Sequence, residues 1–330
     1  IDPNVGVVAV PDNRLTRLSE MSHSQKTIPA AVEFVDIAGL VKGASEGEGL
    51  GNQFLSHIRE VDAIAEVVRM FDDEDVHHVS GEVDPLRDIE VIDLELVLAD
   101  LQSVEKQLER AERDSKGGDK DIIAQRDVLQ KIVPVLQAGK AARAVELDEK
   151  EKPVAKKLQL LTMKPIMYIL NKKSGNLNVE AEGGERWRQL KTHLDSSSAG
   201  YVTVDVGVEQ ELSDVHDDER EDFRRELGVA ENGVDALIKA GYTLLDLISF
   251  FTTGEKESRA WTVKRGSTAP EAGAAIHSDF RDKFIRAEVI AWDILLAAGS
   301  YAKAREQGIL RTEGKEYIVN NGDVMEFLHG

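Results

Sequence analysis

The chain has 330 residues, of which 42% are hydrophobic and 31% charged, and its formal net charge is −20. It has no Cys and no run of about 18 apolar residues, which excludes disulfide and Cys-ligated zinc sites and gives no membrane span. A uniformly acidic surface repels phosphate backbones, so only a local basic patch would bind nucleic acid.

The chain alternates strands and helices on both sides of a long helical stretch. Apolar runs predict strands over residues 5–10, 31–35, 63–71, 165–170 and 201–204. Residues 52–59 predict a helix between the second and third strands. Strand, loop, helix and strand in this order are typical of a parallel α/β sheet.

The hydrophobic period changes to that of a coiled coil in the middle of the chain. Apolar residues follow 3-4 spacing at Leu94, Val97, Leu101, Val104, Leu108 and Ala111, and heptad spacing at Ile122, Leu129, Ile132 and Leu136. A polar turn at residues 115–119 separates the two runs. The pattern predicts an antiparallel hairpin of two helices of roughly 20–25 residues, the second bent or frayed by Pro134.

Basic residues lie along one edge of the predicted hairpin. They are Lys106, Arg110, Arg113, Lys116 and Lys120. Lys106, Arg110 and Arg113 are candidates for a partner-binding surface. The alternative is an ordinary solvated helix face, on which these cations offset neighbouring Glu105, Glu109 and Glu112.

The C-terminal segment is nearly neutral, with 11 Lys and Arg against 12 Asp and Glu over residues 248–330. Strands at residues 260–263 and 317–319 around a helix near 270–281 predict a small α+β module. The expected organisation is therefore an α/β domain of residues 1–93 and 152–247, a helical insertion of 94–151, and a terminal module of 248–330.

One motif follows a buried strand directly. Asp36 and Gly39 stand in a D-x-x-G spacing, which nucleotide switches use to reach Mg²⁺ through water and to bring a backbone N–H to the γ-phosphate. A run of glycines follows, typical of a loop that reorders with the phosphate state, at Gly43, Gly47, Gly49 and Gly51.

A second motif, residues 171–174, resembles the base-reading N-K-x-D of GTPases. It ends in Ser174, which lacks the carboxylate that guanine needs, and Asn171 alone could be a plain turn residue.

Together these segments resemble the Obg-like ATPase family. The resemblance rests on residues 36–45, 47–55, 57–64, 79–81, 84–90, 260–262 and 276–280. The inserted hairpin and the terminal module, which is similar to a TGS domain, indicate the YchF branch. The implied fold is a P-loop NTPase-type α/β sheet with an inserted antiparallel coiled-coil arm and a C-terminal α+β TGS-like domain.

The resemblance implies a cytoplasmic, monomeric switch that hydrolyses ATP or GTP with Mg²⁺ and associates with ribosomes through the large subunit, and with RNA. Asp36 and Gly39 fall on its magnesium and γ-phosphate motif, with Asp36 reaching Mg²⁺ through water. The base motifs are matched by Asn171, Lys172 and Ser174 and by Asp205, Val206 and Gly207. Leu40 stands where many GTPases carry a water-orienting Gln, so His78 is the catalytic candidate, the alternative being a surface polar residue.

The chain departs from the family pattern at its start. It contains no G-x-x-x-x-G-K-[ST] segment and begins at Ile1 without an initiator Met, which predicts an N-terminally truncated protein. A non-hydrolysing module that binds protein or RNA is therefore the competing hypothesis. The choice between ATP and GTP stays open.

Overall fold

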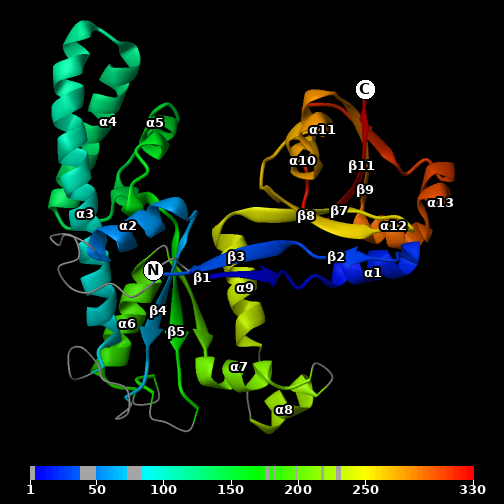
Figure 1. The fold of residues 1–330 in the computed structure, drawn as a ribbon, viewed down its shortest axis with the longest axis horizontal. Coiled ribbons are helices and arrows are strands. Elements are labelled where there is room, and N and C mark those ends of the chain that lie inside the picture. Colours follow the sequence, from blue (N-terminus) through cyan, green and yellow to red (C-terminus); the bar gives the residue numbers. More distant parts are fainter. Residues whose placement is uncertain are drawn as a thin grey trace. The chain divides into compact units, whose positions relative to one another are not determined.

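A computed structural model describes residues 4–37, 50–72, 83–174, 178–180, 183–197, 199–216, 219–227 and 232–330, without the side chains of 50–53 and 221. They form two compact units (Figure 1). Unit 1 contains residues 1–5 and 35–234, and unit 2 contains residues 6–34 and 235–330. Residues 6–34, expected in the α/β domain, thus group with the C-terminal segment.

The sheet of unit 1 is parallel, with strand order β4-β5-β6. Its strands are β4 (Ile64–Arg69), β5 (Ile166–Asn171) and β6 (Gly200–Val204). The continuous apolar run of β5 is buried on every residue but the last, as in a parallel strand covered on both faces. Among the described strands β4 pairs only with β5, and its Val67 is 62% exposed.

Helices cover this sheet and extend away from it. They are α2 (Leu50–Glu60), α3 (Pro85–Asp114), α4 (Lys120–Gln137), α5 (Glu151–Lys157), α6 (Glu185–Ser196), α7 (Val206–Ser213), α8 (Arg220–Glu226) and the start of α9 (Gly233–Leu244). Ile89 of α3 and Leu190 and Leu194 of α6 pack with Tyr168 of β5. The lower part of α3 is therefore anchored on the sheet.

The upper part of α3 and α4 form the predicted antiparallel hairpin, hereafter the arm (Figure 1). Its core joins the two helices and α5 through Val97, Val104, Ala111, Leu129, Ile132, Leu136 and Ala155. The seam position predicted for Leu94 is wrong, because this side chain is 50% exposed. α3 has 30 residues and α4 only 18, with Gln137 bonded to Glu105, so Leu94 lies beyond the end of α4. Pro134 lies in the last turn of α4.

Unit 2 contains a six-stranded mixed sheet of order β10-β9-β11-β7-β8-β2. Its strands are β2 (Thr27–Ile28), β7 (Leu247–Thr252), β8 (Ser258–Lys264), β9 (Phe284–Ala291), β10 (Arg311–Glu313) and β11 (Asp323–His329). The strand predicted at 317–319 is reduced to a single bridge between Ile318 and Thr268. The Tyr317 hydroxyl and Asn320 N instead donate to the Asp323 carboxylate and form a turn. The strand, β11, therefore begins only at Asp323.

Helices pack on both faces of this sheet. They are α1 (Asn13–Ser22), α10 (Ala269–Ile276), α11 (Ser278–Asp282), α12 (Trp292–Ala298) and α13 (Tyr301–Glu306). One apolar core joins α10 to the sheet, and the other joins α1, α12 and α13 to its opposite face. Ser24 Oγ contacts Ser258 Oγ at 2.7 Å and donates to Gly254 O at 2.7 Å, which also holds residues 6–34 in this unit.

A two-stranded sheet completes the described strands. It consists of β1 (Asn4–Ala9) and β3 (Ala31–Asp36). Val10 N donates to Ala30 O at 2.8 Å, and Val32 and Phe34 pack in the core of unit 2. Across the described helices of both units, none is long and apolar enough to cross a lipid bilayer.

Candidate functional site

The two predicted base-reading segments lie together at the carboxyl edge of the parallel sheet. Asn171 ends β5, and its Oδ1 accepts a hydrogen bond from Val206 N at 3.2 Å. Ser174 N donates to Asp205 Oδ2 at 2.6 Å, and Lys172 N donates to Val204 O at 2.8 Å. Parallel strands end at the same edge, so segments 31 or more positions apart form one loop cluster, hereafter the base edge.

Asp205 fixes the geometry of the base edge. Its Oδ1 accepts from Val208 N at 3.1 Å and caps α7, while its Oδ2 holds Ser174 N. Gly207 lies in the first turn, where a Cβ would come within 3.4 Å of Asp205 Oδ1. This positioning role was missed from the sequence, although an Asp directly before a helical stretch is a recognisable N-cap signal.

The loop after β5 is also fixed from its other side. Asn178 accepts from Lys173 N at 3.0 Å and donates to Lys173 O at 3.1 Å. The Lys172 ammonium pairs with Glu180, and burial lowers the pKa of Lys172. Ser174 is exposed, so the position where a GTPase presents a carboxylate carries only a hydroxyl.

Asp36 ends β3 with an exposed carboxylate that has no hydrogen-bond or ion-pair partner among the described residues. Nor do those residues bring three or more His, Cys, Asp or Glu together around a possible metal. An open carboxylate fits Mg²⁺, which is commonly bound by one or two carboxylates together with substrate phosphates and water.

The rest of the predicted switch lies largely outside the described residues. This holds for Gly39, Leu40, Gly43, Gly47, Gly49 and His78. Gly51 is in the first turn of α2, so the predicted loop gives way to helix by residue 50.

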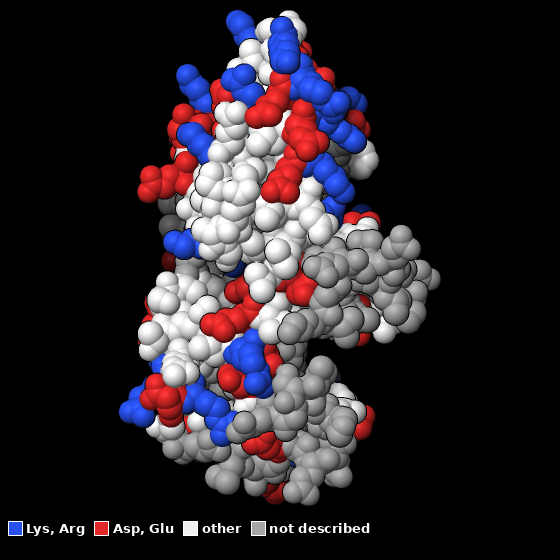
Figure 2. Space-filling model, turned by 90° about the vertical axis from the view of Figure 1, so that its left-hand side faces the viewer, with Lys and Arg blue, Asp and Glu red and all other residues white. Residues whose placement is uncertain are grey.

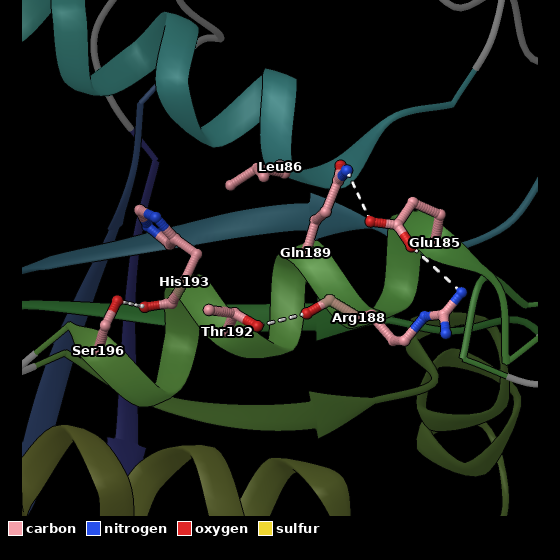
Figure 3. Close-up of a pocket in the computed structure, with 7 residues that line it drawn as sticks. All are labelled: Leu86, Glu185, Arg188, Gln189, Thr192, His193 and Ser196. Carbon is pink, nitrogen blue, oxygen red and sulfur yellow. Dashed lines mark hydrogen bonds and ion pairs between the residues drawn. The ribbon is translucent and has the colours of Figure 1, made fainter.

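A cleft of about 450 Å³ lies between α6 and the start of α3, away from the predicted site residues (Figure 3). It is lined by Leu86, Glu185, Arg188, Gln189, Thr192, His193 and Ser196. Glu185 pairs with Arg188 at 3.1 Å, and Thr192 Oγ1 donates to the carbonyl of Arg188. Because these groups are paired within α6, we assign no chemistry to this cleft.

Buried titratable groups lie on the sheet near His193, whose ring meets Tyr168 edge-on at 6.2 Å. Glu66 of β4 is in register with Tyr168. Burial, with Asp93 and Asp88 of α3 adding repulsion, raises the pKa of Glu66 to about 9. Glu66 Oε2 and His193 Nε2 are buried and have no hydrogen-bond partner among the residues that the structure describes.

The candidate partner residues of the arm lie on one face of α3. Lys106, Arg110 and Arg113 are exposed, and Figure 2 shows Lys and Arg gathered over the arm with acidic side chains between them. Arg113 Nε donates to the backbone carbonyl of Glu109 at 3.3 Å, and not to its carboxylate.

The neighbouring acids turn to the other helix instead. Glu105 and Glu112 accept from Gln137 and Gln130 of α4 at 3.4 and 3.5 Å. Within the described part of the chain, Lys106, Arg110 and Arg113 therefore form no ion pair with Glu105, Glu109 or Glu112. Their positive charge is left facing solvent.

Comparisons with known proteins cover both units. Residues 12–95 match a family described as a 50S ribosome-binding GTPase, and residues 247–329 match the C-terminal family of YchF GTPases, described as a protein of unknown function. The "Ribosome-binding ATPase YchF" of Bacillus subtilis is 49% identical over 327 residues, and that of Escherichia coli O157:H7 is 46% identical over 328. Each alignment covers 99% of this chain and 89% of the relative.

A solved structure agrees with these relatives. The YchF GTPase of Schizosaccharomyces pombe superimposes with a TM-score of 0.86 at 34% identity, covering 99% of this chain and 88% of that one. This confirms the predicted fold class of parallel sheet, helical insertion and C-terminal mixed-sheet module. The predicted N-terminal truncation finds no support in the comparisons, which span 89% of the bacterial relatives.

Proposed function

Because this chain belongs to the YchF family of ribosome-binding ATPases, we propose that it is a cytoplasmic, nucleotide-dependent switch that hydrolyses ATP and binds the ribosome. The observation that carries the proposal is the base edge. Three hydrogen bonds there join the segments after β5 and β6 into one preformed polar loop cluster. Nucleotides bind at this edge in open α/β sheets.

The residues proposed for the phosphate side start with Asp36, the last residue of β3. Asp36 would hold Mg²⁺ through water, and Gly39 would allow a backbone N–H to reach the γ-phosphate. When bound, Mg²⁺ supplies positive charge that offsets the charge developing on the phosphates. The glycine segment, with Gly43, Gly47, Gly49 and Gly51, changes with the phosphate state. Leu40 cannot orient water, so His78 is proposed for that role.

The residues proposed for the base side are Asn171, Lys172, Ser174 and the turn of Asp205, Val206 and Gly207. Asn171 and Asp205 hold the two loops in place, as their hydrogen bonds support. Without a carboxylate at Ser174, the base edge accepts adenine at least as well as guanine. ATP is therefore the proposed substrate, with GTP as the weaker one.

The proposed partner surface comprises the arm and the C-terminal module, acting as a monomer on the large ribosomal subunit. Lys106, Arg110 and Arg113 contact ribosomal RNA. The support is their exposure and the absence of ion pairs to Glu105, Glu109 and Glu112 within the described residues. Phosphate contacts of this kind weaken steeply with salt.

Ribosome co-sedimentation tests the partner surface. The triple variant Lys106→Glu, Arg110→Glu, Arg113→Glu should lose most ribosome binding and its salt dependence. A matched control reverses three exposed lysines of α5, Lys152, Lys156 and Lys157. Unchanged sedimentation of the first variant, with circular dichroism showing a folded protein, would reject the role of the arm.

A separate test concerns the phosphate side. The 330 residues contain no G-x-x-x-x-G-K-[ST] segment, whose backbone N–H groups and Lys hold the phosphates in P-loop proteins. We therefore expect this chain by itself to bind ATP only weakly. Titration calorimetry with Mg²⁺–ATP measures this directly, and micromolar affinity would contradict the expectation.

A further inference from the structure

A second cleft lies where α2 meets the base of the arm. Its volume is about 290 Å³, and it is lined by Leu55, Ser56, Arg59, Ala99, Gln102, Ser103 and Lys106. Three of these residues come from α2 and four from α3. Arg59 and Lys106 thus bring one positive charge from each helix to a single cleft.

The floor of this cleft is apolar and firmly packed. Leu55 and Ala99 are 6% and 7% exposed and belong to one core with Ile58, Leu96 and Leu161. Lys164 Nζ donates to the backbone carbonyl of Arg59 at 3.0 Å and fixes the last turn of α2. The two helices are therefore held in place, so the cleft is built before any ligand arrives.

The cations of the cleft, Arg59 and Lys106, have no ion-pair partner in the part of the chain that the structure describes, although the chain carries a net charge of −20. Arg59 interacts electrostatically with the buried Asp100, but the Asp100 carboxylate accepts its hydrogen bonds from Leu161 N and Thr162 N at 2.9 and 2.8 Å. A guanidinium and an ammonium beside the hydroxyls of Ser56 and Ser103 are the donors that bind phosphate oxygens.

Lys106 of the cleft is also the first cation of a row on the arm. Lys106, Arg110 and Arg113 follow i, i+4 and i+7 spacing on one face of α3, so they rise in steps of about 6 and about 4.5 Å along the helix. A single small anion would use only the cleft. A polyanionic strand would use the cleft and the row together, which favours a nucleic-acid backbone.

We propose that the α2–α3 cleft binds one phosphodiester group of an RNA strand, with Arg59 and Lys106 as its ligands, and that the strand continues along Arg110 and Arg113. The proposal rests on the ribosome-binding function proposed above. It adds Arg59 of α2, which lies outside the arm, to the proposed contact surface. RNA in the cleft would therefore contact α2 and the arm at once.

The test is fluorescence anisotropy of the full 330-residue chain with a labelled 12-nucleotide oligouridylate over a salt series. The unaltered chain should bind at low salt. Each phosphate contact on a single strand contributes about 0.7 to the slope of log K against log salt, so Arg59→Gln with Lys106→Gln should lower that slope by about 1.4. Arg59→Lys with Lys106 unaltered keeps both charges and should keep most of the slope of the unaltered chain. Lys152→Gln, an exposed lysine of α5, is the matched control.

The outcomes separate this inference from the function on which it rests. A wild-type slope in Arg59→Gln, with a reduced slope in Arg110→Gln with Arg113→Gln, overturns the cleft alone. No RNA binding by the unaltered chain overturns both the cleft and the arm surface. A third outcome is that Arg59→Gln with Lys106→Gln abolishes the binding of inorganic phosphate but leaves the RNA affinity unchanged. The cleft would then be a site for free anions, and the RNA assignment would be overturned. Thermal unfolding of every variant shows whether the fold is kept.

Discussion

The base edge and the outer face of the arm use charged and polar side chains in opposite ways. At the base edge, Asn171 and Asp205 accept hydrogen bonds from backbone N–H groups of neighbouring loops. On the arm, Lys106 and Arg110 have no ion-pair partner among the described residues. Polar groups that are satisfied internally determine loop geometry, whereas unpaired surface cations add little stability and remain available to a partner. Mutations should therefore separate the two regions, with stability lost in one and binding lost in the other.

The largest effect on stability is expected at Asp100 of α3, a buried polar group that is satisfied internally, as those of the base edge are. Its side chain is fully buried and accepts from Leu161 N, Thr162 N and Thr162 Oγ1. Asp100→Ala leaves two buried N–H groups unpaired and should lower the free energy of unfolding by about 3 kcal/mol. Urea denaturation measures the change. Lys106→Ala, on the same helix, should change it by less than about 0.5 kcal/mol. Equal losses of unfolding free energy in Asp100→Ala and Lys106→Ala would contradict the distinction between internally bonded polar groups and unpaired surface cations.

Glu66 should make stability depend on pH. Its pKa rises from 4.5 to about 9 in the folded chain, through burial first and then Asp93 and Asp88. Tyr168 and His193 also belong to this cluster. The folded state keeps the proton while the unfolded state releases it, so the stabilisation is complete below about pH 4.5 and lost as pH rises towards 9.

The loss can reach about 1.4 kcal/mol per pH unit, the limit for one proton. Glu66→Gln carries no titrating proton and should flatten the profile of unfolding free energy between pH 6 and 8. Asp93, whose pKa burial also raises, leaves a smaller slope. Parallel profiles for Glu66→Gln and the unaltered chain would show that Glu66 is ionised in the folded protein.

Asp205 tests the base edge itself. Asp205→Ala removes the cap of α7 and the tie to Ser174, and should cost about 1–2 kcal/mol. Amide hydrogen exchange should quicken at Ser174 and Val208, the two donors that lose their acceptor. Asp214→Ala, at the other end of α7, is the control. Unchanged exchange at both amides would mean that Asp205 does not fix the loops.

The elements with strong local sequence patterns were predicted correctly, whereas features that depend on tertiary contacts were not. The apolar run of β5 and the heptads of the arm each decide their own structure, so both were found. α1 was missed although Leu15, Leu18 and Met21 follow its core face, because it has only 10 residues and its other side chains are polar. The base edge was located by motif, but its Asp205 clamp depends on two loops meeting in space. Arg59 gave no signal at all, since the cleft exists only where α2 packs on α3.

The smallest expected effect is a change of base preference at Ser174. Its backbone N–H is held by Asp205, so the side chain projects from a fixed point of the base edge. A carboxylate there would accept two hydrogen bonds from guanine, while a hydroxyl cannot. Ser174→Asp should raise the ratio of GTP to ATP affinity about tenfold, or about 1.4 kcal/mol. Saturation-transfer NMR competition measures this ratio even when both nucleotides bind weakly.

Ser174→Asn is the matched control, because it has the size of Asp without the charge and should leave the ratio near that of the unaltered chain. A clear GTP preference of the unaltered chain would show that a group other than residue 174 reads the base. An equal shift in the Asp and Asn variants would mean that the change acts by moving the loop. Only a shift confined to Ser174→Asp agrees with a base edge whose geometry is set by Asn171 and Asp205 and whose preference is set by one exposed side chain.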